Sequence, residues 1–146
     1  MDNEHLFVML DDCIDYAKEI LTSSKTLESF AMVLEVDNNV RSIHIQDQRG
    51  EERYEALLQV LRDEAKAEKV TAIALLANVT IPDSFSPAVS SGIRIHIEEK
   101  NFEADNKLSA RLLYVPYQLY KTKEDEQVRI QLHDPIPVGL ACEIFV

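Results

Sequence analysis

The sequence predicts an α+β fold of two layers: a mainly antiparallel sheet of about six strands with two helices on one face. Two segments repeat apolar residues at three- and four-residue steps, a spacing typical of amphipathic helices. Several other segments alternate apolar and polar residues, as half-buried strands do. A chain of 146 residues buries about two-thirds of its unfolded surface, so we expect residues 1–146 to form a single domain.

Two amphipathic helices are predicted. The first can be capped by Asp2 or Asn3. Its apolar stripe consists of Leu6, Met9, Leu10, Cys13, Ile14, Ala17, Ile20 and Leu21. Its outer face carries Asp11, Asp12, Asp15 and Glu19 against Lys18. The second helix spans about residues 51–68 and presents Tyr54, Leu57, Leu58, Leu61 and Ala65 on one face.

A β-hairpin is predicted over residues 29–46. Asn38 and Asn39 suit a two-residue turn, because Asn tolerates the left-handed conformation that such turns require. This turn places Leu34 opposite Ile43, so that the apolar sides of the two strands coincide. A central strand covered on both faces is predicted at residues 70–81, which follow the second helix, because both sides of this segment are apolar.

The remaining chain predicts further strands. Pro116 forbids one ladder hydrogen bond, so its strand should lie at an edge or contain a bulge. The predicted segments are a loop at 82–91, a strand at 93–98, a polar connection at 100–106, a strand at 110–120, a charged turn at 121–127, a strand at 128–133 and a short last strand at 144–146.

The composition excludes several classes of function. The formal charge of −11 opposes binding to nucleic acids or anionic membranes, which both need a basic surface. The three glycines lie far apart, so no glycine-rich cradle for phosphate is present. The sequence also lacks the HExxH, paired CxxC, GxSxG and P-loop motifs, and we expect no cofactor.

A cytoplasmic protein is expected. The N-terminus is acidic, unlike a secretory signal, and the longest uncharged run, 70–82, is too short and mixed for a membrane span. Cys13 and Cys142 are expected to be small buried side chains rather than a disulfide.

A resemblance covers most of the chain from Phe30 onward. It rests on the hairpin 30–45, the strands 72–79 and 93–98, the pair Pro116–Tyr117 and the terminal Ile144–Phe145. In these respects the chain is similar to a group of small uncharacterised bacterial α+β proteins with no assigned activity. The resemblance implies a bacterial α+β domain and transfers no site residue.

One set of polar residues is a candidate site. Strand alternation turns the side chains of His44, His96, Glu98 and His133 away from the apolar faces, and Glu35 is expected opposite Ser42. Imidazoles and carboxylates together suit a transition metal or acid–base chemistry near neutral pH. The other interpretation is a sheet face covered by water or by a partner, because polar residues must occupy it in any case. No catalytic or cofactor-binding residue is assigned.

We therefore expect a non-enzymatic protein-interaction or binding module, whose partner is another protein or a second copy in a homodimer. The alternative is a metal-dependent or His/Glu acid–base enzyme that uses the polar face of the sheet. Clustering of the three histidines with Glu98 would favour the enzyme, and scattering would favour the binding module.

Overall fold

The computed structural model describes residues 4–45, 50–101, 107–122, 124–139, 142 and 144–145. The helices are α1 (Glu4–Ser24), α2 (Gly50–Lys66) and the short 3-10 helix η1 (Asp83–Phe85). The strands are β1 (Phe30–Glu35), β2 (Val40–Ile43), β3 (Val70–Thr80), β4 (Ser91–Asn101), β5 (Lys107–Thr122), β6 (Asp125–Leu132) and β7 (Ile136–Gly139). The caps proposed for α1 at Asp2 and Asn3 lie outside the described residues, as do the connecting residues 102–106.

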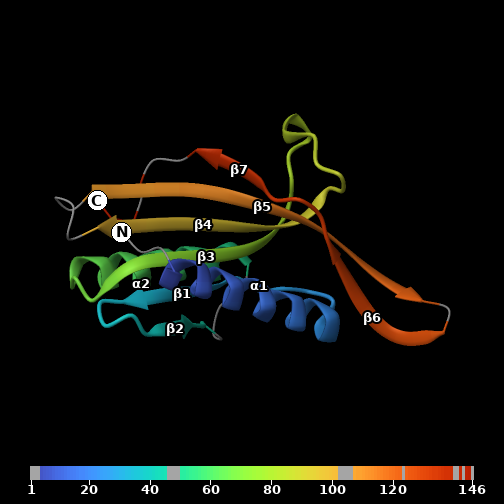
Figure 1. The fold of residues 1–146 in the computed structure, drawn as a ribbon, viewed down its shortest axis with the longest axis horizontal. Helices are drawn as coiled ribbons and strands as arrows, with labels where there is room; N and C mark the ends of the chain where they lie inside the picture. The colour runs from blue at the N-terminus through green and yellow to red at the C-terminus, as the bar shows by residue number, and fades with distance from the viewer. Residues whose placement is uncertain are drawn as a thin grey trace.

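The strands form a curled antiparallel sheet in the order β2-β1-β3-β4-β5-β6, and β7 pairs with β5 (Figure 1). The predicted α+β class, the antiparallel sheet and the central position of β3 are therefore confirmed. The hairpin of β5 and β6 extends beyond the other strands in Figure 1.

A bulge next to Pro116 separates β6 from β7. Tyr117 pairs with Leu132 and Tyr114 pairs with Ile136, so residues 133–135 face the shorter segment 115–116. The backbone N–H of His133 donates to the carbonyl oxygen of Pro116 across this bulge at 2.8 Å. Pro116 thus lies where the ladder is already irregular, one of the two positions expected for it.

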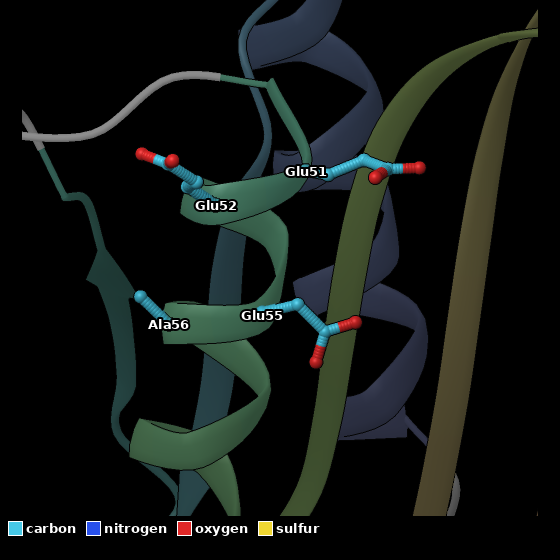
Figure 2. A pocket seen from close by; sticks show the side chains of 4 residues that line it. All are labelled: Glu51, Glu52, Glu55 and Ala56. Carbon is cyan, nitrogen blue, oxygen red and sulfur yellow. The ribbon is translucent and has the colours of Figure 1, made fainter.

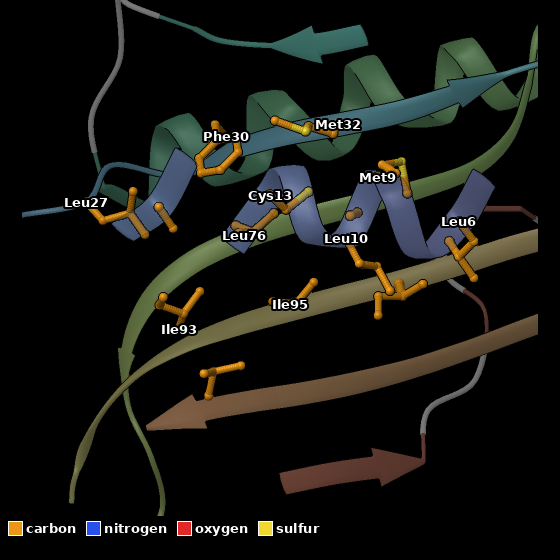
Figure 3. Close-up of a cluster of buried hydrophobic side chains, with 14 of the residues drawn as sticks. Leu6, Met9, Leu10, Cys13, Leu27, Phe30, Met32, Leu76, Ile93 and Ile95 are labelled. Carbon is orange, nitrogen blue, oxygen red and sulfur yellow. The ribbon is translucent and has the colours of Figure 1, made fainter. Parts of the chain in front are cut away.

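Helix α1 packs on one face of the sheet. Its buried side chains are Leu6, Met9, Leu10, Cys13, Ala17 and Leu21. Figure 3 shows Met9, Leu10 and Cys13 among side chains of β1, β3 and β4. This burial confirms the predicted apolar stripe. Neither helix of the described part is long and apolar enough to cross a membrane.

Helix α2 packs on the opposite face, which corrects the prediction that both helices share one face. The buried cluster under α2 contains Val33 of β1 and Leu75 of β3, whereas the cluster under α1 contains Met32 and Leu76. Consecutive strand residues point to opposite faces, so the two helices lie on opposite sides. Because β1 and β3 are apolar on both sides, both faces need cover, and each helix forms its own helix-on-sheet layer.

The register of the β1–β2 hairpin differs from the predicted one by three residues. Leu34 pairs with Val40, and Ile43 pairs with Ala31. The backbone N–H of Glu35 donates to the carbonyl oxygen of Asn39 at 2.8 Å, and Asn38 adopts a left-handed φ of 71°. The loop is therefore longer than two residues. An odd shift moves Ile43 to the face under α2.

The expected last strand is also displaced. The seventh strand is β7, at Ile136–Gly139, and Ile144 and Phe145 are not in a strand. These two side chains are instead buried against α2 and β3. Ile144 and Phe145 thus contact the sheet through their side chains, and Val146 of the predicted strand lies outside the described residues.

Candidate functional site

Three polar side chains on β4 face the side of the sheet that α2 covers. Arg94 lies under the ring of Tyr54 of α2, with its guanidinium carbon 5.1 Å from the ring centroid. His96 and Glu98 follow at two-residue steps and therefore point to the same side as Arg94. The polar pattern that predicted a half-buried strand at 93–98 thus brings these residues into a row.

His96 and Glu98 form a buried pair. Their side chains are 3% and 0% exposed, and His96 Nε2 lies 2.5 Å from Glu98 Oε2. The sequence pattern left this face to water, to a partner or to a site, whereas the chain itself buries these two side chains. As a carboxylate, Glu98 accepts a hydrogen bond from His96 Nε2–H.

Glu98 also binds the C-terminal segment. Its Oε1 accepts the backbone N–H groups of Ile144 and Phe145 at 2.9 and 3.0 Å. The Cys142 thiol lies nearby, and burial, the Glu98 charge and a hydrogen bond to Glu98 raise its pKa. A buried carboxylate needs several donors to offset its desolvation, and the chain end supplies them.

This geometry makes the His96–Glu98 pair a structural element. Both carboxylate oxygens are engaged by protein donors, and Ile144 and Phe145 bury the pair beneath the C-terminal segment. Acid–base catalysis requires a substrate atom within hydrogen-bond reach of the acid or base. In the described structure, protein atoms occupy the positions where such a substrate would bind.

The other candidate ligands lie elsewhere. His44 is on the α1 side, stacked on Phe30 at 5.6 Å between ring centroids and 5.4 Å from the ring of Tyr16. His133 lies at the bulge after β6 and contacts Gln118 Oε1 at 3.1 Å. Among the described residues, no group of three or more His, Cys, Asp or Glu side chains could hold a metal ion.

The expected pairing of Glu35 with Ser42 is wrong, because Ser42 lies opposite Met32. Glu35 instead forms an ion pair with Arg41 at 3.8 Å. The three-residue register shift therefore removes Glu35 from the candidate set.

Two hollows lie outside this row. A cavity of about 170 Å³ is lined by Tyr16, His44 and Arg53 among other residues, and Arg53 forms an ion pair there with Glu28 at 3.8 Å. Figure 2 shows the second hollow on the first turns of α2, where Glu51 and Glu55 point to one side and Glu52 to the other. These carboxylates suit the positive end of the helix dipole, which is sufficient reason for them there.

The α2 side of the sheet continues beyond the helix. We call this surface the open sheet face, and it consists of Arg94, Leu112, Tyr114, Ile136 and Val138, bordered by Phe85. Helix α2 packs chiefly over β1 and β3. Tyr114 is paired with Arg94 on one side and Ile136 on the other, so the three side chains form a row across three strands.

Arg94 has a polar atom that lacks a partner. Its Nε is buried and has no hydrogen-bond acceptor within the described part of the chain. A buried donor left without an acceptor costs about 1–3 kcal/mol. The alternation of residues 93–98 turns Arg94 to the same side of the strand as His96 and Glu98, but no motif in the sequence singles out Arg94, Tyr114 or Ile136.

Comparison with known proteins adds no further assignment. No family model, curated protein or solved structure matches the chain.

Proposed function

We propose that the protein is a non-enzymatic binding module that holds a protein partner on the open sheet face. The observation that carries this proposal is the row of Arg94, Tyr114 and Ile136 beside α2. It joins the half-buried Ile136 and the mostly buried Tyr114 to the half-buried Arg94, whose Nε has no acceptor among the described residues. Interfaces commonly combine aromatic, aliphatic and arginine side chains.

The shape of this surface supports a macromolecular partner. The row spans β4, β5 and β7, and a sheet surface of this kind offers breadth rather than depth. Phe85 at its border is 36% exposed and contacts the ring of Tyr114 at 5.5 Å between centroids. An exposed aromatic side chain on an aromatic neighbour is a suitable anchor for a partner.

The enzyme alternative has less support. It would need a substrate to reach His96 or Glu98, and both are covered by the C-terminal segment. Burial and backbone hydrogen bonds give these residues a role in holding the fold together.

A photo-cross-linking experiment in cells tests the proposal. Phe85 is replaced by the photoreactive p-benzoylphenylalanine, and Phe7 of α1, which is 58% exposed, receives the same replacement as a matched control. We expect protein adducts from position 85 and few from position 7. Mass analysis of each adduct distinguishes a second copy of the chain from a different protein.

Adducts from position 7 without adducts from position 85 would move the interface to the acidic face of α1. Absence of adducts at both positions would contradict a protein-binding role. A reaction abolished by His96→Gln in a protein that still folds would instead support the enzyme.

A further inference from the structure

We propose that Arg94 anchors a carboxylate of the bound partner, and that an apolar side chain next to that carboxylate packs on Tyr114 and Ile136. This inference rests on the proposed function and names the chemistry that the open sheet face recognises. The ligand class is a peptide segment in which a carboxylate adjoins an aliphatic or aromatic side chain.

The donor geometry of Arg94 carries the inference. Its Nε is buried without an acceptor in the described part of the chain, and no described carboxylate forms an ion pair with Arg94. Arg94 as a whole is half-buried, and its two Nη groups present N–H donors in one plane, as a fork that matches the two oxygens of a carboxylate. A carboxylate bound at these Nη groups would give the guanidinium the ion-pair partner that the described part of the chain does not supply.

The surroundings of Arg94 hold the guanidinium in place. The ring of Tyr54 lies on it at 5.1 Å, and Arg94 pairs with Ala77 and with Tyr114 on the neighbouring strands. Cation–π contact restricts the side chain without using its N–H donors. The ring therefore restrains the orientation of the guanidinium without engaging its Nη donors.

The apolar neighbours define the rest of the ligand. Tyr114 contacts Phe85 on one side and pairs with Ile136 on the other. These side chains offer a surface for an apolar group and few polar partners for a second charge. An isolated inorganic anion would leave this surface unused, so a carboxylate on an apolar body fits better.

The overall charge does not prevent this binding. The formal charge of −11 repels anions at long range, but ordinary ionic strength screens such repulsion beyond about 8 Å. At contact distance the local donor and the apolar surface decide the affinity.

A titration followed by NMR tests the inference. The probes are N-acetyl-leucine, which carries a terminal carboxylate, and N-acetyl-leucyl-glutamic acid amide, which carries a side-chain carboxylate. Each probe is compared with an analogue in which that carboxylate is replaced by an uncharged amide. Inorganic phosphate is titrated separately. We expect saturable shifts of the backbone amide signals of Arg94, Tyr114 and Ile136 with one or both carboxylates. The uncharged amides should bind at least about tenfold more weakly.

Variants provide the second arm. Arg94→Met keeps the packing under Tyr54 but removes the donors, and we expect at least about tenfold weaker binding of the carboxylate. Arg94→Lys keeps the charge without the fork and should bind with intermediate affinity. Arg111→Met is the control, because Arg111 pairs with Glu99 at 3.4 Å on the opposite side of the sheet, and binding should not change.

Equal binding of carboxylate and amide, or no shift with any peptide probe, would overturn the inference. Binding of phosphate alone would overturn the choice of ligand class. Because the acid and amide probes are compared on the unmodified protein, the result does not depend on the folding of a variant. Cross-links at position 85 together with a negative titration would retain the proposed binding function and reject Arg94 as its anchor.

Discussion

His96 Nε2 lies 2.5 Å from Glu98 Oε2, and the two side chains are 3% and 0% exposed. The same carboxylate accepts backbone N–H groups from Ile144 and Phe145, residues that are distant in the sequence. One glutamate therefore connects β4 to the C-terminal segment.

Loss of the Glu98 charge should destabilise the fold strongly. Glu98→Gln keeps the shape of the side chain, but its amide can direct an N–H group at the donors that now surround the carboxylate. A buried donor left without an acceptor costs about 1–3 kcal/mol in the free energy of unfolding, and Glu98 accepts from the backbone N–H groups of Ile144 and Phe145 as well as contacting His96. Urea denaturation monitored by circular dichroism measures this loss.

Glu99→Gln is the matched control on the same strand. Its side chain is 23% exposed and pairs with Arg111 at 3.4 Å on the other side of the sheet. Exposed pairs contribute about 0–1 kcal/mol, so the change should be small. Equal losses in the two variants would contradict the role assigned to Glu98.

Gly92 should not tolerate a side chain. A Cβ atom at this position would lie 2.4 Å from Ile81 Cδ1 and 2.6 Å from Ile81 Cγ1. Ile81 is 1% exposed and has little room to move, so we expect Gly92→Ala to cost about 1–3 kcal/mol of stability. Gly139→Ala, where a Cβ meets nothing within 4 Å, should leave the melting temperature nearly unchanged. A melting temperature of Gly92→Ala equal to that of the parent would refute the close contact.

Because the Cys13 thiol is buried, we expect the folded protein to lose stability at alkaline pH. Burial, and secondarily the charge of Asp12, raise its pKa from 9.0 to about 12 in the folded protein. Above pH 9 the unfolded chain loses the proton while the folded chain retains it, so stability falls as the pH rises from 9 towards 12. Between pH 8 and pH 10 the loss from this group is about 1.4 kcal/mol.

Cys13→Ala isolates that contribution. The variant removes the titrating group, so its stability should decline less between pH 8 and pH 10 than that of the parent. Denaturation at both pH values gives the difference. Parallel declines in the two proteins would show that the thiol ionises equally easily in the folded and unfolded chains.

Truncation of two adjacent side chains of α1 should change the stability to very different extents. Met9 is 0% exposed under the sheet, and Met9→Ala should cost about 2–5 kcal/mol by leaving a cavity. Val8 is 48% exposed, and Val8→Ala should change stability by less than about 0.5 kcal/mol. Thermal denaturation compares them, and similar effects would be inconsistent with α1 packed by its apolar stripe.

Divalent metals should not stabilise the protein appreciably. A ligand at a hundred times its dissociation constant contributes about 2.7 kcal/mol, roughly 5–10 °C in melting temperature for a chain of this length. Since His44, His96 and His133 lie in separate places, we expect shifts below about 2 °C with zinc, nickel, manganese or iron. A larger shift that disappears in the double variant His44→Ala, His133→Ala would reveal a metal site. His96 is left intact because of its buried contact.

Local sequence patterns were sufficient to predict the helices and most of the strands. The stripe from Leu6 to Leu21 repeats with the period of a helix, and residues 93–98 alternate with the period of a strand. These are local properties, because the period depends on backbone geometry and on which side of one element is buried. The central position of β3 followed in the same way from its two apolar sides.

Which surfaces meet could not be predicted from these patterns. Met32 and Val33, like Leu75 and Leu76, are all apolar, so periodicity could not assign α1 and α2 to opposite faces. The register of the first hairpin depended on the hydrogen bond that closes the loop from Glu35 to Asn39. The burial of Glu98 depended on N–H donors from Ile144 and Phe145, and the Arg94 row depended on strands β5 and β7 lying beside β4. Apart from the hairpin loop, these contacts join residues far apart in the sequence or select one of two equally apolar sides, and local patterns carry no information about either.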